Sequence, residues 1–99
     1  MRRVVILAEA AEDIEVARDF YDAQQPGIGD YGADCLVTDI ESLALYHGIH
    51  FRQFGYFRML SDRFPFGIYY RETNDETQVC AVLDLRRDPS WIRKELSKR

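Results

Sequence analysis

Residues 57–91 read FRMLSDRFPFGIYYRETNDETQVCAVLDLRRDPSW, and this stretch decides the fold. Two of its runs, FGIYYRE at 66–72 and TQVCAVLD at 77–84, are rich in the β-branched and aromatic residues typical of strands. The segment Thr73–Glu76 between them contains Asn and Asp, which tolerate left-handed backbone geometry and bond their own backbone. The pattern therefore predicts a β-hairpin.

The second of these runs is apolar on both faces of the strand that it predicts. Alternation places one set of side chains, Val79, Ala81 and Leu83, on one face and a second set, Cys80, Val82 and Asp84, on the other. Because the second set is also largely apolar, we expect this strand to be central in a sheet that is covered on both sides.

The residues before this stretch predict a strand and two helices. Residues 3–8 (RVVILA) form a short apolar run typical of a strand buried on both faces. From Glu9 onward, apolar residues recur at helical spacing on a stripe of Ala10, Ile14, Ala17 and Tyr21 that is widened by Val16 and Phe20. The Pro-Gly pair at 26–27 ends this helix.

A second helix is predicted over residues 30–45. Leu36, Ile40 and Leu43 define its core face at the spacing i, i+4, i+7. Gly32 falls on the same stripe one turn earlier, where it adds no side chain and costs about 1 kcal/mol relative to alanine. Either helices pack closely there, the helix begins later, or the core has a local hole, and the sequence leaves these alternatives open.

The rest of the chain adds one more strand and a terminal helix. Residues 56–60 (YFRML) fit a strand, and Asp88–Pro89 offers an N-cap followed by proline at the first helical position. Residues 46–55 have no clear period. They contain His47 and His50, but no third converging ligand accompanies the two histidines, so no metal site is predicted.

Length and composition fit a single domain over residues 1–99. The 99 residues are 46% hydrophobic and 30% charged. The predicted class is α+β: a small antiparallel-rich sheet in the order β-α-α-β-β-β, two N-terminal helices packed on it and a short C-terminal helix. Cys35 and Cys80 are expected to be buried thiols in a reducing compartment, the cytoplasm, because the N-terminal segment is neither a signal peptide nor a membrane span. No cofactor is expected.

The charge is unevenly distributed along a chain whose net charge is −4. Between Glu9 and Glu41, ten acids face one base, whereas between Arg86 and Arg99 six bases face two acids. A basic end is compatible with an anionic partner, although most charge runs are simply solvated faces. The negative total argues against strong non-specific binding to nucleic acid.

Three segments carry a resemblance to a known family: FYDAQQPGIGDY at 20–31, FRMLSDRFPFGIYYR at 57–71 and AVLDLRRDPSW at 81–91. Their order and spacing over essentially the whole chain resemble the RelE/ParE superfamily of type II toxin–antitoxin toxins, especially its ParE-like branch. The resemblance implies a small sheet crossed by two N-terminal helices, and a cognate antitoxin that wraps the toxin in a hetero-oligomer. It also implies one of two activities, inhibition of DNA gyrase or ribosome-dependent cleavage of mRNA.

Two positions separate these activities. The nuclease branch has an arginine about three residues before the tyrosine of its third strand, and counting back from Tyr70 reaches Gly67. Asp84 stands at the end of the last strand, where related toxins often carry a histidine, and a carboxylate there repels an RNA phosphate unless it is protonated. If the chain were a nuclease, the candidates for phosphate binding and proton transfer would be Arg63, Asp84, Arg86 and Arg87.

A partner-binding surface is predicted from Arg58, Arg63, Tyr70, Arg71, Arg86, Arg87 and Trp91. The first three of these arginines could form an anion-binding patch, but we favour their pairing with acids of the first helix. Tyr69 and Tyr70 are adjacent and must point to opposite faces of the sheet, so that at most one can meet a ligand. Trp91 is interpreted as an anchor for the C-terminal segment rather than as a platform for stacked bases.

We therefore expect a ParE-like toxin that acts by protein contact, on DNA gyrase, and not an enzyme. One alternative is a ribosome-dependent mRNA endonuclease. The other is a non-toxic family member kept for partner binding, which a core weakened at Gly32 would favour.

Overall fold

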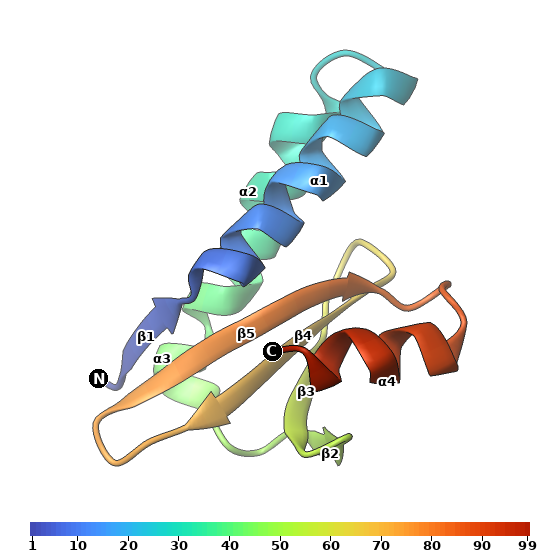
Figure 1. Ribbon diagram of the computed structural model, residues 1–99. Helices are drawn as coiled ribbons and strands as arrows, with labels where there is room; N and C mark the ends of the chain where they lie inside the picture. The colour runs from blue at the N-terminus through green and yellow to red at the C-terminus, as the bar shows by residue number, and fades with distance from the viewer.

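The computed structural model describes residues 1–99 as a five-stranded sheet with helices on both faces (Figure 1). The elements are β1 (Arg3–Ile6), α1 (Ala8–Gln24), α2 (Ile28–Glu41), α3 (Leu43–Tyr46), β2 (Phe51–Gln53), β3 (Tyr56–Leu60), β4 (Phe66–Glu72), β5 (Glu76–Asp84) and α4 (Pro89–Ser97). The strands lie in the order β1-β5-β4-β3-β2, and only β1 and β5 are parallel. The predicted α+β class is confirmed, with one strand and one short helix more than the sequence predicted.

The predicted hairpin is the pair β4–β5, and β5 has a neighbouring strand on each side. The turn between them depends on Thr73, whose hydroxyl accepts hydrogen bonds from the backbone N–H of Asp75 (3.3 Å) and Glu76 (3.1 Å). Asn74 and Asp75, which tolerate left-handed geometry, do not adopt it, because Phe54 is the only non-glycine residue with a positive φ. A side chain can thus close the turn without left-handed backbone.

The core consists of two clusters on opposite faces of the sheet. On one face, α1 and α2 pack on Met59, Phe66, Ile68, Tyr70, Val79 and Val82. On the other face, Ile92 and Leu96 of α4 pack on Tyr69, Ala81 and Leu83. As predicted, β5 is covered on both sides, and the two adjacent tyrosines point in opposite directions.

The predicted alternation along β5 fails at its middle. Tyr69 faces Ala81 and Tyr70 faces Val79, so Cys80 faces no residue of β4 and forms a bulge. The extra residue moves Val79 to the same face as Val82, instead of the face of Ala81 and Leu83. A strict two-residue period cannot reveal such an insertion, because both faces of this strand are apolar.

The first helix buries a narrower stripe than predicted. Ala10, Ile14 and Ala17 are buried, but Val16 and Phe20 are 68% and 50% exposed. These two side chains line a depression together with Val82 and Asp84 of β5 and are not part of the core cluster under α1. The prediction that they widen the core stripe is therefore wrong.

The second helix begins two residues earlier than predicted and is interrupted at Ser42, after which α3 continues to Tyr46. Leu36, Ile40 and Leu43 form the predicted core face and are at most 2% exposed. Gly32 leaves no hole, since an added Cβ would lie 3.3 Å from Cζ of Phe64. Close packing, by a loop residue and not by a second helix, explains this glycine.

Gly29 sets how closely the two helices approach. A Cβ at this position would lie 2.3 Å from the backbone oxygen of Arg18 in α1. The Asp22 carboxylate accepts hydrogen bonds from the backbone N–H of Gly27 (2.9 Å) and Gly29 (3.2 Å), which satisfies donors at the start of α2. The contact therefore fixes the hairpin of α1 and α2 at its turn.

The segment between α3 and β3 forms the edge of the sheet. β2 is only three residues long and pairs with β3, which explains why it shows no period in the sequence. His50 Nδ1 lies 2.5 Å from Tyr70 Oη, which also accepts a hydrogen bond of 2.9 Å from the backbone N–H of Gly48. Burial lowers the pKa of His50, which favours the neutral imidazole, and its Nδ1 can then accept a hydrogen bond from the Tyr70 hydroxyl.

The C-terminal helix starts as predicted. Asp88 is its N-cap, with a carboxylate that accepts a hydrogen bond of 2.8 Å from the backbone N–H of Ser90, and Pro89 occupies the first turn. None of the helices has the length and apolar character needed to cross a membrane.

Replacement of the two helical glycines should have unequal effects. Gly29→Ala should lower the free energy of unfolding by about 2 kcal/mol, because the methyl group meets a backbone oxygen that cannot move without separating the helices. Gly32→Ala should change it by less than about 1 kcal/mol, because the ring of Phe64 needs to shift only slightly and the helix gains propensity. Urea unfolding followed by circular dichroism measures both, and equal losses would contradict the assigned role of Gly29.

Candidate partner-binding cleft

A cleft of about 420 Å³ opens beside β5, between α1 and α4. It is lined by Asp13, Val16, Ala17, Phe20, Phe66, Val82, Asp84, Arg87, Trp91, Glu95 and Arg99. The two helices lie on opposite faces of the sheet: in Figure 1, α1 lies above β5, on the side where β1 joins it, and α4 lies below β5. The second half of β5 forms the floor.

The second half of β5 is accessible from this side because β1 is too short to pair with it. β1 pairs with β5 only from Glu76 to Val79, and after Ile6 the chain turns away into α1. Two side chains then take the place of the missing strand. The Asp13 carboxylate accepts a hydrogen bond of 2.9 Å from the backbone N–H of Val82, and Arg99 Nη1 donates to the carbonyl of Cys80 at 3.1 Å.

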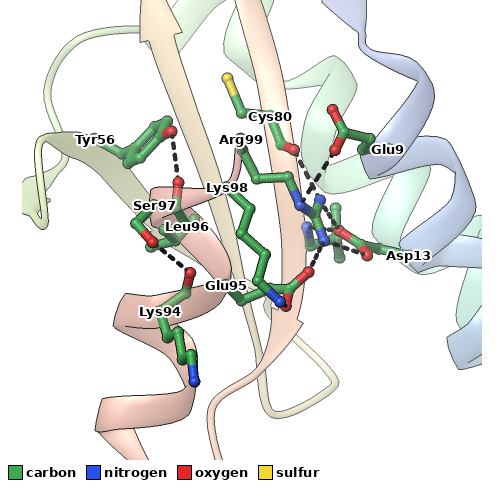
Figure 2. Close-up of polar contacts among 11 residues, drawn as sticks. Glu9, Asp13, Tyr56, Cys80, Lys94, Glu95, Leu96, Ser97, Lys98 and Arg99 are labelled. Carbon is green, nitrogen blue, oxygen red and sulfur yellow. Dashed lines mark hydrogen bonds and ion pairs between the residues drawn. The ribbon is translucent and has the colours of Figure 1, made fainter.

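Arg99 connects the two helical layers at one end of the cleft (Figure 2). Its guanidinium donates to both oxygens of Asp13, at 2.8 and 3.0 Å, and to Glu95 at 3.1 Å. The side chains of Arg99 and Asp13 are only 7% and 16% exposed. Hydrogen bonding from Arg99 lowers the pKa of Glu95, and the bond to Asp13 is the main cause that raises the pKa of Arg99.

The walls of the cleft are apolar. Val16 and Phe20 project from α1, and Trp91 projects from the first turn of α4. The guanidinium carbon of Arg87 lies 3.8 Å from the centroid of the Trp91 ring, which is a cation–π contact. Trp91 also packs against the α4 cluster, in agreement with its predicted role as an anchor. An exposed apolar depression with polar margins is typical of a protein-binding site.

Asp84 and Arg86 form a closed ion pair at the other end of the cleft. Arg86 Nη2 lies 2.7 Å from the Asp84 carboxylate, which also accepts a hydrogen bond of 2.9 Å from the backbone N–H of Arg86. Hydrogen bonding from Arg86 is the main cause that lowers the pKa of Asp84, and the carboxylate remains ionised at neutral pH. Neither group is free to serve as a proton donor.

The other predicted site residues do not gather in the cleft. Arg58 donates to Gln53 at 3.0 Å, Arg71 donates to Gln78 at 2.8 Å, and Arg63 lies beside a separate depression next to α2. None of them pairs with an acid of α1, so that prediction is wrong; the α1 carboxylate nearest the sheet, Asp13, is paired with Arg99. The three arginines therefore form no common anion-binding patch.

The burial of Tyr70 also contradicts its prediction as a partner-binding residue. Its side chain is fully buried, and its hydroxyl is engaged by Gly48 and His50, so it cannot contact a partner in this fold. The reason is the strap of residues 47–50, which covers the tyrosine and has no signature in the sequence. Nowhere do three His, Cys, Asp or Glu side chains lie where they could jointly hold a metal ion.

Most residues that line the cleft were not predicted as site residues, among them Asp13, Val16, Phe20 and Arg99. The sequence contains a signal for Val16 and Phe20: both are apolar, but both lie outside the narrow stripe by which α1 packs on the core, which is typical of an exposed binding surface. Asp13 and Arg99 are 86 positions apart, and no spacing in the sequence connects them.

Comparisons with known proteins identify the fold. No family model and no curated protein matches the sequence. Among solved structures, a chain of the chromosomal ParDE TA system from P. aeruginosa is similar, with a TM-score of 0.74 and 20% sequence identity. The similarity covers 83% of this chain and 94% of that one. The protein thus has the fold of a component of a ParDE system, as the sequence resemblance implied.

The ion pair across the cleft should be tested by its contribution to stability. Arg99→Met should lower the free energy of unfolding by about 3 kcal/mol, because it leaves the Asp13 carboxylate sequestered and unpaired. Lys98→Met is the matched control: its amine lies 3.7 Å from Glu95 and is exposed, so its loss should cost less than about 0.5 kcal/mol. Equal stability of the two variants in urea unfolding would contradict the role given to Arg99.

The Asp84–Arg86 pair predicts a pH dependence. Because the pKa of Asp84 is lower in the folded state, the pair stabilises the fold above the unfolded carboxyl pKa of about 3.9 and ceases to do so as the pH falls through the folded value. Arg86→Met should therefore have a lower Tm than the wild type at pH 7, and the difference should shrink at pH 2.5. A difference that is constant with pH would contradict this assignment.

Proposed function

We propose that this chain is the toxin of a type II toxin–antitoxin pair, that a cognate antitoxin neutralises it, and that it acts by protein contact on DNA gyrase. The observation that carries the proposal is the similarity in fold to a ParDE component over most of both chains. The order of sequence segments that resembles the ParE-like branch supports it independently.

The geometry at Gly67 favours protein contact over RNA cleavage. A Cβ at this position would lie 2.9 Å from Leu85 Cδ2 and 3.0 Å from Tyr69 Cε2, so the strand has no room for the arginine that the nuclease branch carries there. The other candidates for RNA chemistry do not come together, because Arg63 lies apart from them beside a depression next to α2. Asp84 is ionised and bound to Arg86, and Arg87 lies on the Trp91 ring. A nuclease needs free cations and a proton-transfer group at one point, and these residues do not supply them.

The exposed apolar cleft favours a protein partner. It is the site of the exposed Val16 and Phe20, and the same depression contains the ring of Trp91. Large apolar and aromatic side chains in a depression are the features that contribute most to the affinity of protein interfaces. A cognate antitoxin that covers this surface would also shield it from water.

Expression in a bacterial host tests the proposal directly. Induction of the chain alone should arrest growth, and co-expression of the protein encoded by the adjacent reading frame should restore it. The purified chain should inhibit supercoiling of relaxed plasmid by DNA gyrase, and primer extension should show no new mRNA ends after induction.

The possible results distinguish the three functions considered. New mRNA ends on ribosome-bound transcripts, together with unaffected supercoiling, would replace gyrase inhibition by the nuclease function. Normal growth of cells that express the folded chain without its neighbour would leave only a non-toxic partner-binding protein. Gly67→Arg is a useful control, because steric conflict should destabilise the sheet and should not create nuclease activity.

A further inference from the structure

We propose that the antitoxin inserts an extended segment into the cleft between α1 and α4, where its backbone pairs with Val82–Asp84 of β5 as an added strand. The inference rests on the proposed function, because it names the antitoxin as the occupant. The inference is based on the orientation of the backbone groups at the floor of the cleft, in addition to the cleft itself.

The floor offers an unused pair of backbone groups. The N–H of Val82 points away from β4, since it donates to Asp13, and alternation then directs the carbonyl of Val82 and the N–H of Asp84 to the same side. The bonds of Phe66 agree with this orientation. Although Phe66 lies opposite Asp84, its N–H and carbonyl bond Phe64 and Ser61, so β4 does not use the N–H of Asp84.

The carbonyl of Val82 and the N–H of Asp84 favour the binding of an extended segment over the binding of a helix. A donor and an acceptor on the same side of a strand are the groups that a neighbouring strand would engage. A helix satisfies its own backbone and would leave both groups without partners, which is unfavourable once water is excluded. Addition of a strand to an open sheet edge is a common mode of peptide recognition, in which the backbone supplies affinity and alternate side chains supply specificity.

The walls of the cleft suit the side chains of such a segment. Alternate residues of an extended chain point to opposite faces of the sheet. Residues on one face would meet Val16 and Phe20 of α1, and residues on the other would meet Trp91 of α4. Apolar side chains on both faces of the segment would therefore be buried between the two helices.

The charge on α1 defines the residues that flank this segment. Glu12 and Asp19 are exposed, form no ion pair and lie one turn before and after Val16, on the same side of the helix. From Glu9 to Glu41 the chain has ten acids and one base. The occupant should therefore carry lysine or arginine where it passes α1, which makes it a basic and apolar segment.

Amide hydrogen exchange tests the backbone pairing. The full-length chain, labelled with ¹⁵N, is measured alone and in complex with the full-length protein encoded by the adjacent reading frame. Exchange of the Asp84 amide should slow by about tenfold or more in the complex, because it gains an acceptor. The Leu83 amide, which faces β4, is the internal reference and should change much less.

Surface variants test the walls. Val16→Glu and Phe20→Glu should each raise the Kd for the adjacent-frame protein by about tenfold or more, because both side chains are largely exposed in the free chain and can be replaced without unfolding it. Ile49→Glu is the matched control: it is 74% exposed, lies outside the cleft and should change the Kd by less than about twofold. Glu12→Lys should weaken binding and reduce its dependence on salt.

The outcomes separate this inference from the proposed function. If the adjacent-frame protein binds and rescues growth but leaves the Asp84 amide in fast exchange, the added strand is refuted and the toxin function stands. If Ile49→Glu and Phe20→Glu weaken binding of the adjacent-frame protein equally, the cleft is refuted as the binding site. If it does not bind at all, both the inference and the antitoxin partnership fail.

Discussion

The burial of β5 on both faces is the constraint on which the rest of the structure depends. Val79 and Val82 pack against the α1–α2 layer, while Ala81 and Leu83 pack against α4, so this one strand belongs to both hydrophobic clusters. The bulge at Cys80 divides its side chains between the two faces in this way. The sheet separates the two clusters. Arg99 connects the helical layers on either side of it, because its guanidinium bonds both Asp13 of α1 and Glu95 of α4.

A second consequence is that β5 is longer than the strand beside it. β1 covers it only as far as Val79, and further pairing on that side comes from the side chains of Asp13 and Arg99. An open sheet edge is normally a liability for aggregation, and charged side chains placed against it are one way of protecting it. Here the protection stops at Val82, and the cleft begins at the same point. The geometry that leaves the edge open also places apolar walls on both sides of it.

The arginines of the sheet show why local charge is a poor guide to function. In the sequence they suggest a basic surface for an anion. In the structure each has its own partner: Arg58 lies over Phe51 and bonds Gln53, Arg71 bonds Gln78, and Arg86 bonds Asp84. Gln53 and Gln78 are neutral, so Arg58 and Arg71 keep their charge; only Arg86 is paired with a carboxylate, and Arg63 lies beside a separate depression next to α2. The arginines are thus spread over the molecule, whereas the apolar side chains of Val16, Phe20 and Trp91 come together in one cleft.

The sequence by itself determined the class of the fold, the β4–β5 hairpin, the core faces of the helices and the cap at Asp88, because periodicity and capping are local properties of the chain. It also revealed the family resemblance and the missing arginine at Gly67. Only the tertiary structure decided the rest: the exposure of Val16 and Phe20, the burial of Tyr70, the closeness of Phe64 to Gly32 and the pairing of Asp13 with Arg99. These features depend on which distant segments come together, and an apolar or charged residue looks the same in the sequence whether a neighbour covers it or not.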